Sequence, residues 1–238
     1  MSVVLDIENL SKRPLEQNLN QWVKTSWDDF LEVVNKPEYQ KAKCYYSNGE
    51  ARIETMPIGS DHASDHALIL VAIGLFVAVK SLVLTGKDNC SYRKIGISEV
   101  QPDISYYVGD RSQLIPWGTG IVDLDVYPAP DLAIEIANSS WADDVGKKRL
   151  LYEDLGVKEY WVINVRNAEI LAFATVCSPK GIAEPESPKG SYRIDRSQVI
   201  TGLEIALLEQ ALGMSRQHDH GYVTSWLLTQ LQQNKNNI

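Results

Sequence analysis

A carboxylate in the middle of an apolar strand is the first group that could do chemistry. Residues 131–137 alternate in character and predict a strand whose isoleucines face one way, while Glu135 faces the other way among alanines. A strand this apolar is expected to be central, so Glu135 should be partly buried. A buried carboxylate needs a partner or a metal, and either a cation or a salt bridge to a helix lysine or arginine would satisfy it.

Lys148 is the amine that could act beside this carboxylate. In the helix predicted over residues 142–155, at about 100° per residue, it falls near the centre of the arc of apolar side chains. Asp144 lies one turn earlier on the same side and can pair with it. Lys148 could instead be a snorkelling side chain, whose stem packs on the core while its ammonium reaches water.

Asp103 is the third candidate, at the start of a strand predicted over residues 103–108. Pro102 precedes it, and proline is tolerated at the first residue of a strand. Asp131 also follows a proline, so the residues alone leave the assignment open. Asp103 is preferred because it lies on a different strand from Glu135, and carboxylates from neighbouring strands can converge on one cation.

Two hard oxygen ligands and one amine are the set that a phosphodiester hydrolase needs. Mg²⁺ keeps several waters and takes one or two carboxylates together with substrate phosphate. A bound metal activates a water and offsets charge on the phosphate. A lysine beside it can orient or deprotonate that water and stabilise the negative transition state. These residues therefore predict a Mg²⁺- or Mn²⁺-dependent hydrolase.

The elements that must position these residues follow from periodicity and from turn signals. Strand, helix, strand and hairpin in succession indicate a mixed sheet with helices packed on it. Further expected elements are a helix over 15–34 with Ser26 inside it as an N-cap, a hairpin over 43–56 turning at Asn48-Gly49, a helix over 62–84 closed by Gly86, a long loop over 109–128, a hairpin of strands 158–164 and 169–175, a short strand near Tyr192, and helices over 203–212 and 222–232.

Length and composition bound the class of protein. With 238 residues and 44% hydrophobic content, we expect one domain over residues 1–238, with an N-terminal helical extension (about 1–40) and a C-terminal helical tail (about 202–238). Three widely spaced cysteines fit reduced thiols in the cytoplasm. We expect neither a membrane span nor a signal peptide. The net charge of −8 argues against a non-specific DNA coat, although it leaves room for a local basic cleft.

The chain resembles a known family, the Uma-type endonucleases, which were formerly a domain of unknown function. The resemblance covers roughly residues 26–210 and is most specific from Pro130 to Val165. The matching stretches are CYYSNGEARIETMP, SDHALILVAI, EVQPDISYYVG and APDLAIEIANSS…DDVGKKRLLYEDLGVKEYWVINV. The family is assigned to the PD-(D/E)xK nuclease superfamily. The resemblance implies a restriction-endonuclease-like α/β fold, a mixed β-sheet flanked by helices, with Asp103 as motif aspartate, Glu135 as second acid and Lys148 as amine.

The sequence departs from the written motif at one position that bears on the chemistry. The motif has lysine two residues after the acid, where this chain has Ala137. In such families the lysine is found on the adjacent helix, and Lys148 with Tyr152 four residues later matches that pattern. The family often has Ser-Pro after the acid strand, where this chain has Asn138 and two serines, a change that concerns the turn more than the chemistry.

Other polar residues match the family or look metal-binding without a firm role. Glu50 matches an acid of the family's early hairpin, and it is either a further metal ligand or a surface charge. His66 matches a recurrent histidine, with His62 as a close rival, and either is expected to cap or pack rather than act as a base. Residues 218–220, His-Asp-His, are expected at the surface, because three adjacent residues cannot easily face one ion.

The favoured function is a metal-dependent endonuclease acting on DNA. The alternative is a non-catalytic nucleic-acid-binding or regulatory protein that retains the nuclease fold, and a third possibility is a hydrolase of another phosphate ester. A degenerate relative would be expected to lose one of the three site residues, so their presence favours an enzyme. Six tryptophans and eleven tyrosines suggest a homodimer, since aromatic residues are enriched at interfaces, although they could equally fill the core.

Overall fold

The computed structural model describes residues 13–176 and 190–235 of the chain. The chain groups into two compact units. The smaller unit comprises Met1–Pro57, Ser91–Gln101 and Gly120–Val126, and the larger one Ile58–Cys90, Pro102–Thr119 and Tyr127–Ile238. Each unit has its own six-stranded sheet. The expectation of one domain over the whole chain stays a prediction.

The smaller unit is built on a sheet with one long hairpin. Its strand order is β1 (Val23–Lys24), β3 (Glu50–Glu54), β2 (Lys43–Ser47), β6 (Ser98–Val100), β5 (Tyr92–Lys94) and β8 (Val122–Asp123). Its helices are α2 (Pro14–Gln17), α3 (Trp27–Val34) and the 3₁₀ turn η1 (Pro37–Tyr39). The predicted hairpin is confirmed, and its turn residues Asn48 and Gly49 have positive φ of 52° and 76°, as a tight hairpin turn requires.

The predicted helix over residues 15–34 is wrong as a single element. Strand β1 separates α2 from α3, and Asn20 between them has a φ of 64°, which no helix tolerates. Ser26 is the N-cap of α3 and accepts a hydrogen bond from the Asp29 amide at 3.1 Å. The N-cap signal at Ser26 therefore marked the start of the helix correctly, whereas the apolar pattern over residues 15–34 did not. Helix α3 packs Phe30 against Tyr46 of the hairpin.

The larger unit has a mixed sheet flanked by helices, as predicted. Its strand order is β12 (Ser191–Arg193), β11 (Glu169–Thr175), β10 (Glu159–Asn164), β9 (Leu132–Ala137), β7 (Ile104–Val108) and β4 (Leu84–Asp88). Strands β9 and β10 are parallel, whereas the other neighbours are antiparallel. The α/β class is thus confirmed.

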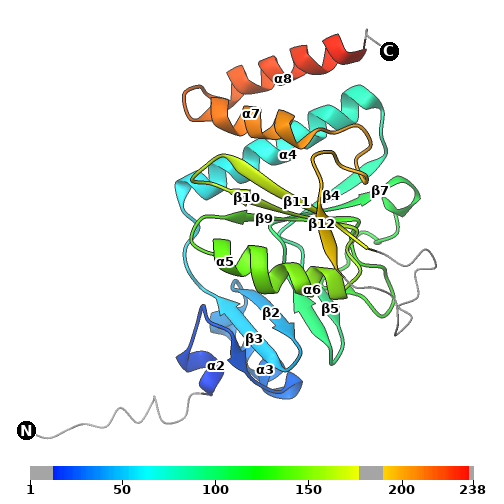
Figure 1. Cartoon of the computed structure of the whole chain (residues 1–238). Helices are drawn as coiled ribbons and strands as arrows, with labels where there is room; N and C mark the ends of the chain where they lie inside the picture. The colour runs from blue at the N-terminus through cyan, green and yellow to red at the C-terminus, as the bar shows by residue number, and fades with distance from the viewer. Residues whose placement is uncertain (1–12, 177–189, 236–238) are drawn as a thin grey trace, which may run out of the picture. The chain divides into compact units, whose positions relative to one another are not determined.

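Helices cover both faces of this sheet (Figure 1). On one face lie α4 (Ser60–Lys80), α7 (Ile205–Ser215) and α8 (His220–Lys235). On the other lies a short helical run formed by α5 (Trp141–Asp143), a π-helical turn (Asp144–Lys148) and α6 (Arg149–Asp154). The two C-terminal helices were expected. The expected loop over 109–128 contains the 3₁₀ turn η2 (Gly109–Arg111) and strand β8.

The expected alternation along β9 is confirmed. Leu132, Ile134 and Ile136 belong to the main core with side chains of α4, α7 and α8. Every residue of β9 is buried, which makes it a central strand. Glu135 therefore faces the opposite side of the sheet, where the run from α5 to α6 lies.

Helix α4 ends earlier than expected, and Gly86 does not cap it. The C-cap is Ser81, in the left-handed conformation, and Gly86 lies within β4 opposite Tyr106. A Cβ at Gly86 would lie 2.9 Å from Cε1 of the Tyr106 ring. Glycine is therefore needed here because the ring of Tyr106, on the neighbouring strand β7, occupies the space of a side chain. The sequence alone had indicated a helix cap at this position.

Helix α4 is also long and apolar enough to cross a membrane by length and composition, with a mean hydropathy of 1.8. Its apolar face nevertheless packs into the core of the larger unit through residues such as Leu68, Ile73 and Phe76. The fully buried Asp65 on this helix accepts a hydrogen bond from Arg216 at 2.7 Å. These contacts are those of a core helix.

Candidate active site

Glu135 and Lys148 meet on the face of β9 that the core does not use. Both are almost fully buried, with 2% and 1% of their surface exposed. The Lys148 Nζ lies 3.9 Å from the Glu135 Oε1, and the Tyr152 hydroxyl donates to the same oxygen at 2.8 Å. The predicted inward direction of Lys148 is confirmed, and the snorkelling alternative is excluded because the ammonium does not reach water.

Asp144 is the closer partner of Lys148. Its Oδ1 lies 2.9 Å from the Lys148 Nζ, while the Ser140 hydroxyl donates to its other oxygen. The two residues begin and end the π-helical turn, an insertion that interrupts the α-helical geometry. Such turns are rare and occur frequently at functional sites. Lys148 is therefore held between the buried carboxyl groups of Asp144 and Glu135.

Asp103 precedes β7 and lies beside Glu135 through the strand register. Ile104 pairs with Ile134 in the antiparallel β7–β9 ladder, so the next pair of positions is Asp103 and Glu135. Directly opposed residues have Cβ atoms about 4.5–5.5 Å apart. The Asp103 Oδ2 accepts the Ile136 amide at 2.7 Å, which ties the carboxylate to β9. The register thus brings the two predicted acids together.

Two histidines from successive turns of α4 border Asp103. The His62 Nε2 lies 3.4 Å from the Asp103 Oδ1. The His66 Nε2 lies 3.2 Å from the Asp103 carbonyl oxygen and 3.2 Å from the Asp88 Oδ1. The sequence singled out both histidines through the family resemblance alone, and their common neighbour emerges only when α4 lies beside the start of β7.

Tyr160 is a site residue that the sequence did not reveal. Its ring stacks on Tyr152 with centroids 4.8 Å apart, and its hydroxyl donates to the Asp144 carbonyl at 2.9 Å. Burial, followed by the nearby carboxylates of Asp144 and Glu135, raises the pKa of Tyr160 well above its usual value. The hydroxyl therefore stays protonated as a donor. The one feature of the sequence that could have indicated Tyr160 is Ala133, because this small residue lies opposite Tyr160 in the parallel β9–β10 pair.

Asp131, the rival of Asp103, is held at the other end of β9. Its carboxylate binds Arg111 at 2.5 Å and Lys158 at 2.8 Å, and it accepts the Val108 amide at 2.9 Å. Glu135 lies four positions further along the chain, about 13 Å away at the usual rise per residue of a strand. The geometry therefore favours Asp103, because Asp131 has two cationic partners of its own and lies too far away to share an ion with Glu135.

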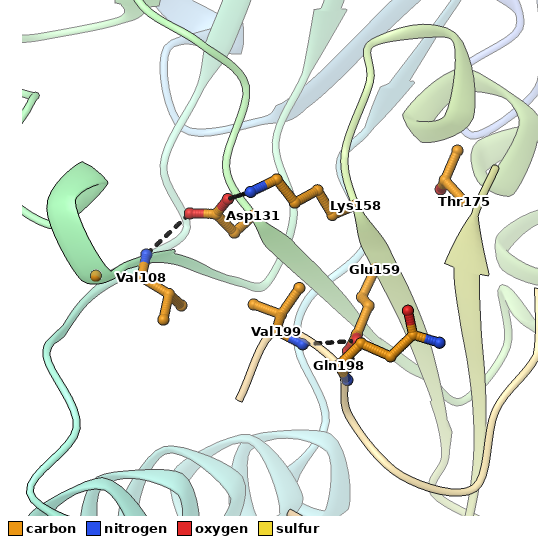
Figure 2. A pocket seen from close by; sticks show the side chains of 8 residues that line it. Val108, Asp131, Lys158, Glu159, Thr175, Gln198 and Val199 are labelled. Carbon is orange, nitrogen blue, oxygen red and sulfur yellow. Dashed lines mark hydrogen bonds and ion pairs between the residues drawn. The ribbon is translucent and has the colours of Figure 1, made fainter. Parts of the chain in front are cut away.

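A cavity of about 440 Å³ opens at this end of the strands, beside Asp131 (Figure 2). Its lining residues are Val108, Gly109, Asp131, Lys158, Glu159, Thr175, Gln198 and Val199. The buried Glu159 accepts hydrogen bonds from the Gln198 and Val199 amides, and also from the side chains of Trp161 and Ser197. Burial nevertheless raises its pKa. These contacts fasten residues 197–199 to β10 and account for Glu159 without a ligand.

Other polar residues singled out in the sequence have local structural partners. Glu50 belongs to the smaller unit, where it pairs with Ser47 in the hairpin, and its role as a metal ligand stays a prediction. The His218 ring stacks on Tyr222 at 4.3 Å, Asp219 accepts the Tyr222 amide at 3.0 Å, and the His220 Nε2 lies 3.0 Å from the Ser64 hydroxyl. The three side chains of this run thus serve different local contacts.

The carboxylates of Asp103 and Glu135 are suitable ligands for a hard divalent cation, although the described residues do not form a complete set of protein ligands. Within the described part of the chain, no three or more His, Cys, Asp or Glu side chains are arranged to hold a metal. Mg²⁺ usually takes only one or two carboxylates and fills its other positions with water and phosphate. Asp103 and Glu135 supply two such carboxylates from neighbouring strands, and this donor set suits the ion.

Comparison with known proteins identifies the family. The chain is similar to a crystal structure from Anabaena variabilis ATCC 29413, described as "a putative nuclease belonging to DUF820". The two are 18% identical, with a TM-score of 0.48, over 85% of this chain and 99% of that one. No curated protein matches significantly. Residues 27–209 match the family model Uma2, described as "Putative restriction endonuclease". Because this match spans most of the chain, the protein belongs to the Uma2 family.

Proposed function

We propose that this protein is a metal-dependent endonuclease that hydrolyses DNA phosphodiester bonds at Asp103, Glu135 and Lys148. The observation that carries the proposal is the buried Lys148, 3.9 Å from Glu135 and 2.9 Å from Asp144. Taking three charges out of water costs several kcal/mol per ion before their attraction offsets it. Replacing such a set with apolar residues is often neutral or stabilising, so a catalytic requirement gives the better account of its presence.

Each residue has a distinct task in this proposal. Asp103 and Glu135 would hold Mg²⁺ or Mn²⁺, which supplies an activated water and offsets phosphate charge when bound. Lys148 places an ammonium beside Glu135, where it can donate to a phosphate oxygen or orient the attacking water. Asp144 holds the amine in place, and Tyr152 orients the Glu135 carboxylate through its hydroxyl. Glu50 is a further proposed ligand through the family resemblance alone.

DNA as substrate is proposed on the strength of the family. The net charge of −8 requires that the contact to phosphates be local, because binding strength scales with the number of phosphates that Lys and Arg neutralise. We further propose that the protein acts as a homodimer, since a two-fold pair could cleave both strands of a duplex.

Metal binding and DNA cleavage, measured together, test the proposed function. Calorimetry should show Mg²⁺ or Mn²⁺ binding by the wild type, and Glu135→Ala should abolish it because the ion loses a carboxylate. Linear duplex DNA should be cleaved when either metal is added, and the cleavage should stop with EDTA. Wild-type protein that binds DNA but neither cleaves it nor binds metal would favour the binding-protein alternative instead. The observation on its side is that Asp103 and Glu135 already accept hydrogen bonds from the Ile136 amide and the Tyr152 hydroxyl.

A further inference from the structure

His62 has a buried ring nitrogen with an unusual environment. Its Nε2 is inaccessible to water and makes no hydrogen bond to the described residues. The nearest acidic atom is the Asp103 Oδ1, 3.4 Å away. A buried nitrogen without a hydrogen-bond partner costs free energy, so this position calls for an explanation other than packing.

The separation of these two atoms fits ligands of one metal ion. Two ligand atoms about 2.1 Å from a cation, at right angles to each other, are about 3.0 Å apart. The His62 nitrogen and the Asp103 oxygen need to approach by only a few tenths of an ångström to reach that geometry. His66 differs from His62, because its Nε2 is already within hydrogen-bond distance of the Asp103 carbonyl oxygen, at 3.2 Å, and its acidic neighbour is Asp88 rather than the Asp103 carboxylate.

We propose that His62 is a nitrogen ligand of the cation at Asp103, and that it makes the site prefer Mn²⁺ over Mg²⁺. This inference rests on the proposed function, which places the cation there. Imidazole is a ligand of transition-metal ions, whereas Mg²⁺ takes oxygen ligands almost exclusively. One nitrogen beside carboxylate oxygens therefore raises the affinity for Mn²⁺ and leaves that for Mg²⁺ nearly unchanged.

Substitution of His62 by glutamine separates ligation from structural support. In His62→Gln, the amide nitrogen can donate a hydrogen bond to Asp103, and the amide oxygen is a hard ligand that suits Mg²⁺. The exposed His218, which stacks on Tyr222, provides the matched control as His218→Gln. The measurement is calorimetric titration of each protein, without DNA, with MnCl₂ and separately with MgCl₂.

The ratio of the two affinities decides the matter. His62→Gln should weaken Mn²⁺ binding by about 10-fold or more, the scale of losses at metal sites, with little change for Mg²⁺. The control should keep both affinities. Equal losses for both ions, or none, would overturn the role of His62 while leaving the proposed function standing. Wild type that binds neither ion would overturn the proposed function as well.

A spectroscopic measurement on the wild type keeps the inference testable even if His62→Gln does not fold. Electron spin-echo modulation of the Mn²⁺-loaded protein should show coupling to an imidazole nitrogen. That coupling should be lost in a folded His62→Gln protein and kept in His218→Gln. A wild-type Mn²⁺ spectrum with no nitrogen coupling would show that His62 does not bind the ion.

Discussion

At the scale of single residues, the site depends on a few buried polar contacts. Lys148, Asp144 and Glu135 are each at most 2% exposed, so each charge relies on its partners rather than on water. Buried polar groups that lose a partner are costly, and their effect on activity and on stability should appear together. Variants at this site therefore need both measurements.

Lys148→Met tests the catalytic amine. Methionine keeps the length and apolar packing of the stem but removes the ammonium, so the rate of metal-dependent DNA cleavage should fall by about 10²- to 10⁴-fold. The variant also takes away the ammonium that Asp144 binds, so urea unfolding should show a lower stability. Lys158→Met is the matched control, because this lysine binds Asp131 at the other end of β9 and Asp131 keeps Arg111. Normal cleavage by Lys148→Met would refute the mechanism.

Tyr152→Phe tests the orientation of Glu135. The change removes only the hydroxyl that donates to the Glu135 Oε1 at 2.8 Å. The free energy of unfolding should fall by about 1–3 kcal/mol, because a buried carboxylate loses a hydrogen-bond donor. The affinity for Mn²⁺ should also differ from that of the wild type, because Glu135 is no longer oriented by Tyr152. Tyr160→Phe is the control, since it deletes the neighbouring hydroxyl, which bonds a main-chain carbonyl. If both variants had the same Mn²⁺ affinity as wild type, Tyr152 would have no part in orienting Glu135.

At the scale of elements, close contact between strands places limits on the sequence. Strands β4 and β7 pair with Gly86 directly opposite Tyr106, and the tyrosine ring occupies the space where a side chain would stand. The position of β7 matters for function, because β7 begins immediately after Asp103. A substitution in β4 that displaces β7 can therefore also displace Asp103.

Gly86→Ala tests this packing with Gly74→Ala as its counterpart. The new methyl at residue 86 would meet the Tyr106 ring at 2.9 Å, and overpacking of this kind costs about 1–3 kcal/mol. Gly74 lies within α4, and a Cβ added there would have no neighbouring atom within 4 Å, so alanine should stabilise the helix by about 0.5–1 kcal/mol. The midpoint temperature of thermal unfolding should fall for Gly86→Ala and rise for Gly74→Ala. A shift of the same sign for both would contradict the packing at Tyr106.

At the scale of the whole molecule, the aromatic residues divide between core and surface. Trp161 is fully buried, whereas Trp117 is fully exposed. Trp27 packs on Tyr46 in the smaller unit at 5.0 Å. Core filling therefore explains part of the aromatic content that suggested an interface, and the case for a dimer rests on exposed side chains such as Trp117.

Light scattering tests the homodimer. A dimer at micromolar concentration should have about twice the 26.7 kDa mass of the chain, and Trp117→Ser should lower the dimer fraction if this side chain lies in the interface. Tyr222→Ser, a second exposed aromatic position, serves as the comparison. A single species of 26.7 kDa for the wild type would remove the proposal.

The sequence by itself determined the features that follow from local periodicity. The alternation of residues 131–137 placed Glu135 on the face opposite the isoleucines, and the helical period placed Lys148 inward. The cap at Ser26 and the turn at Asn48-Gly49 were equally readable. These features depend on side-chain direction along one element, which repeats every two residues in a strand and every 3.6 in a helix.

Tertiary structure alone decided which residues meet. The register of β7 against β9 placed Asp103 beside Glu135, and the position of α4 brought His62 to Asp103. Strand β10 places the Tyr160 hydroxyl at the Asp144 carbonyl. Strand β7 places the Tyr106 ring against Gly86, which the sequence had indicated as a helix cap. Each of these contacts joins residues far apart in the chain, and no local period encodes them, because they depend on how separate elements pair and pack.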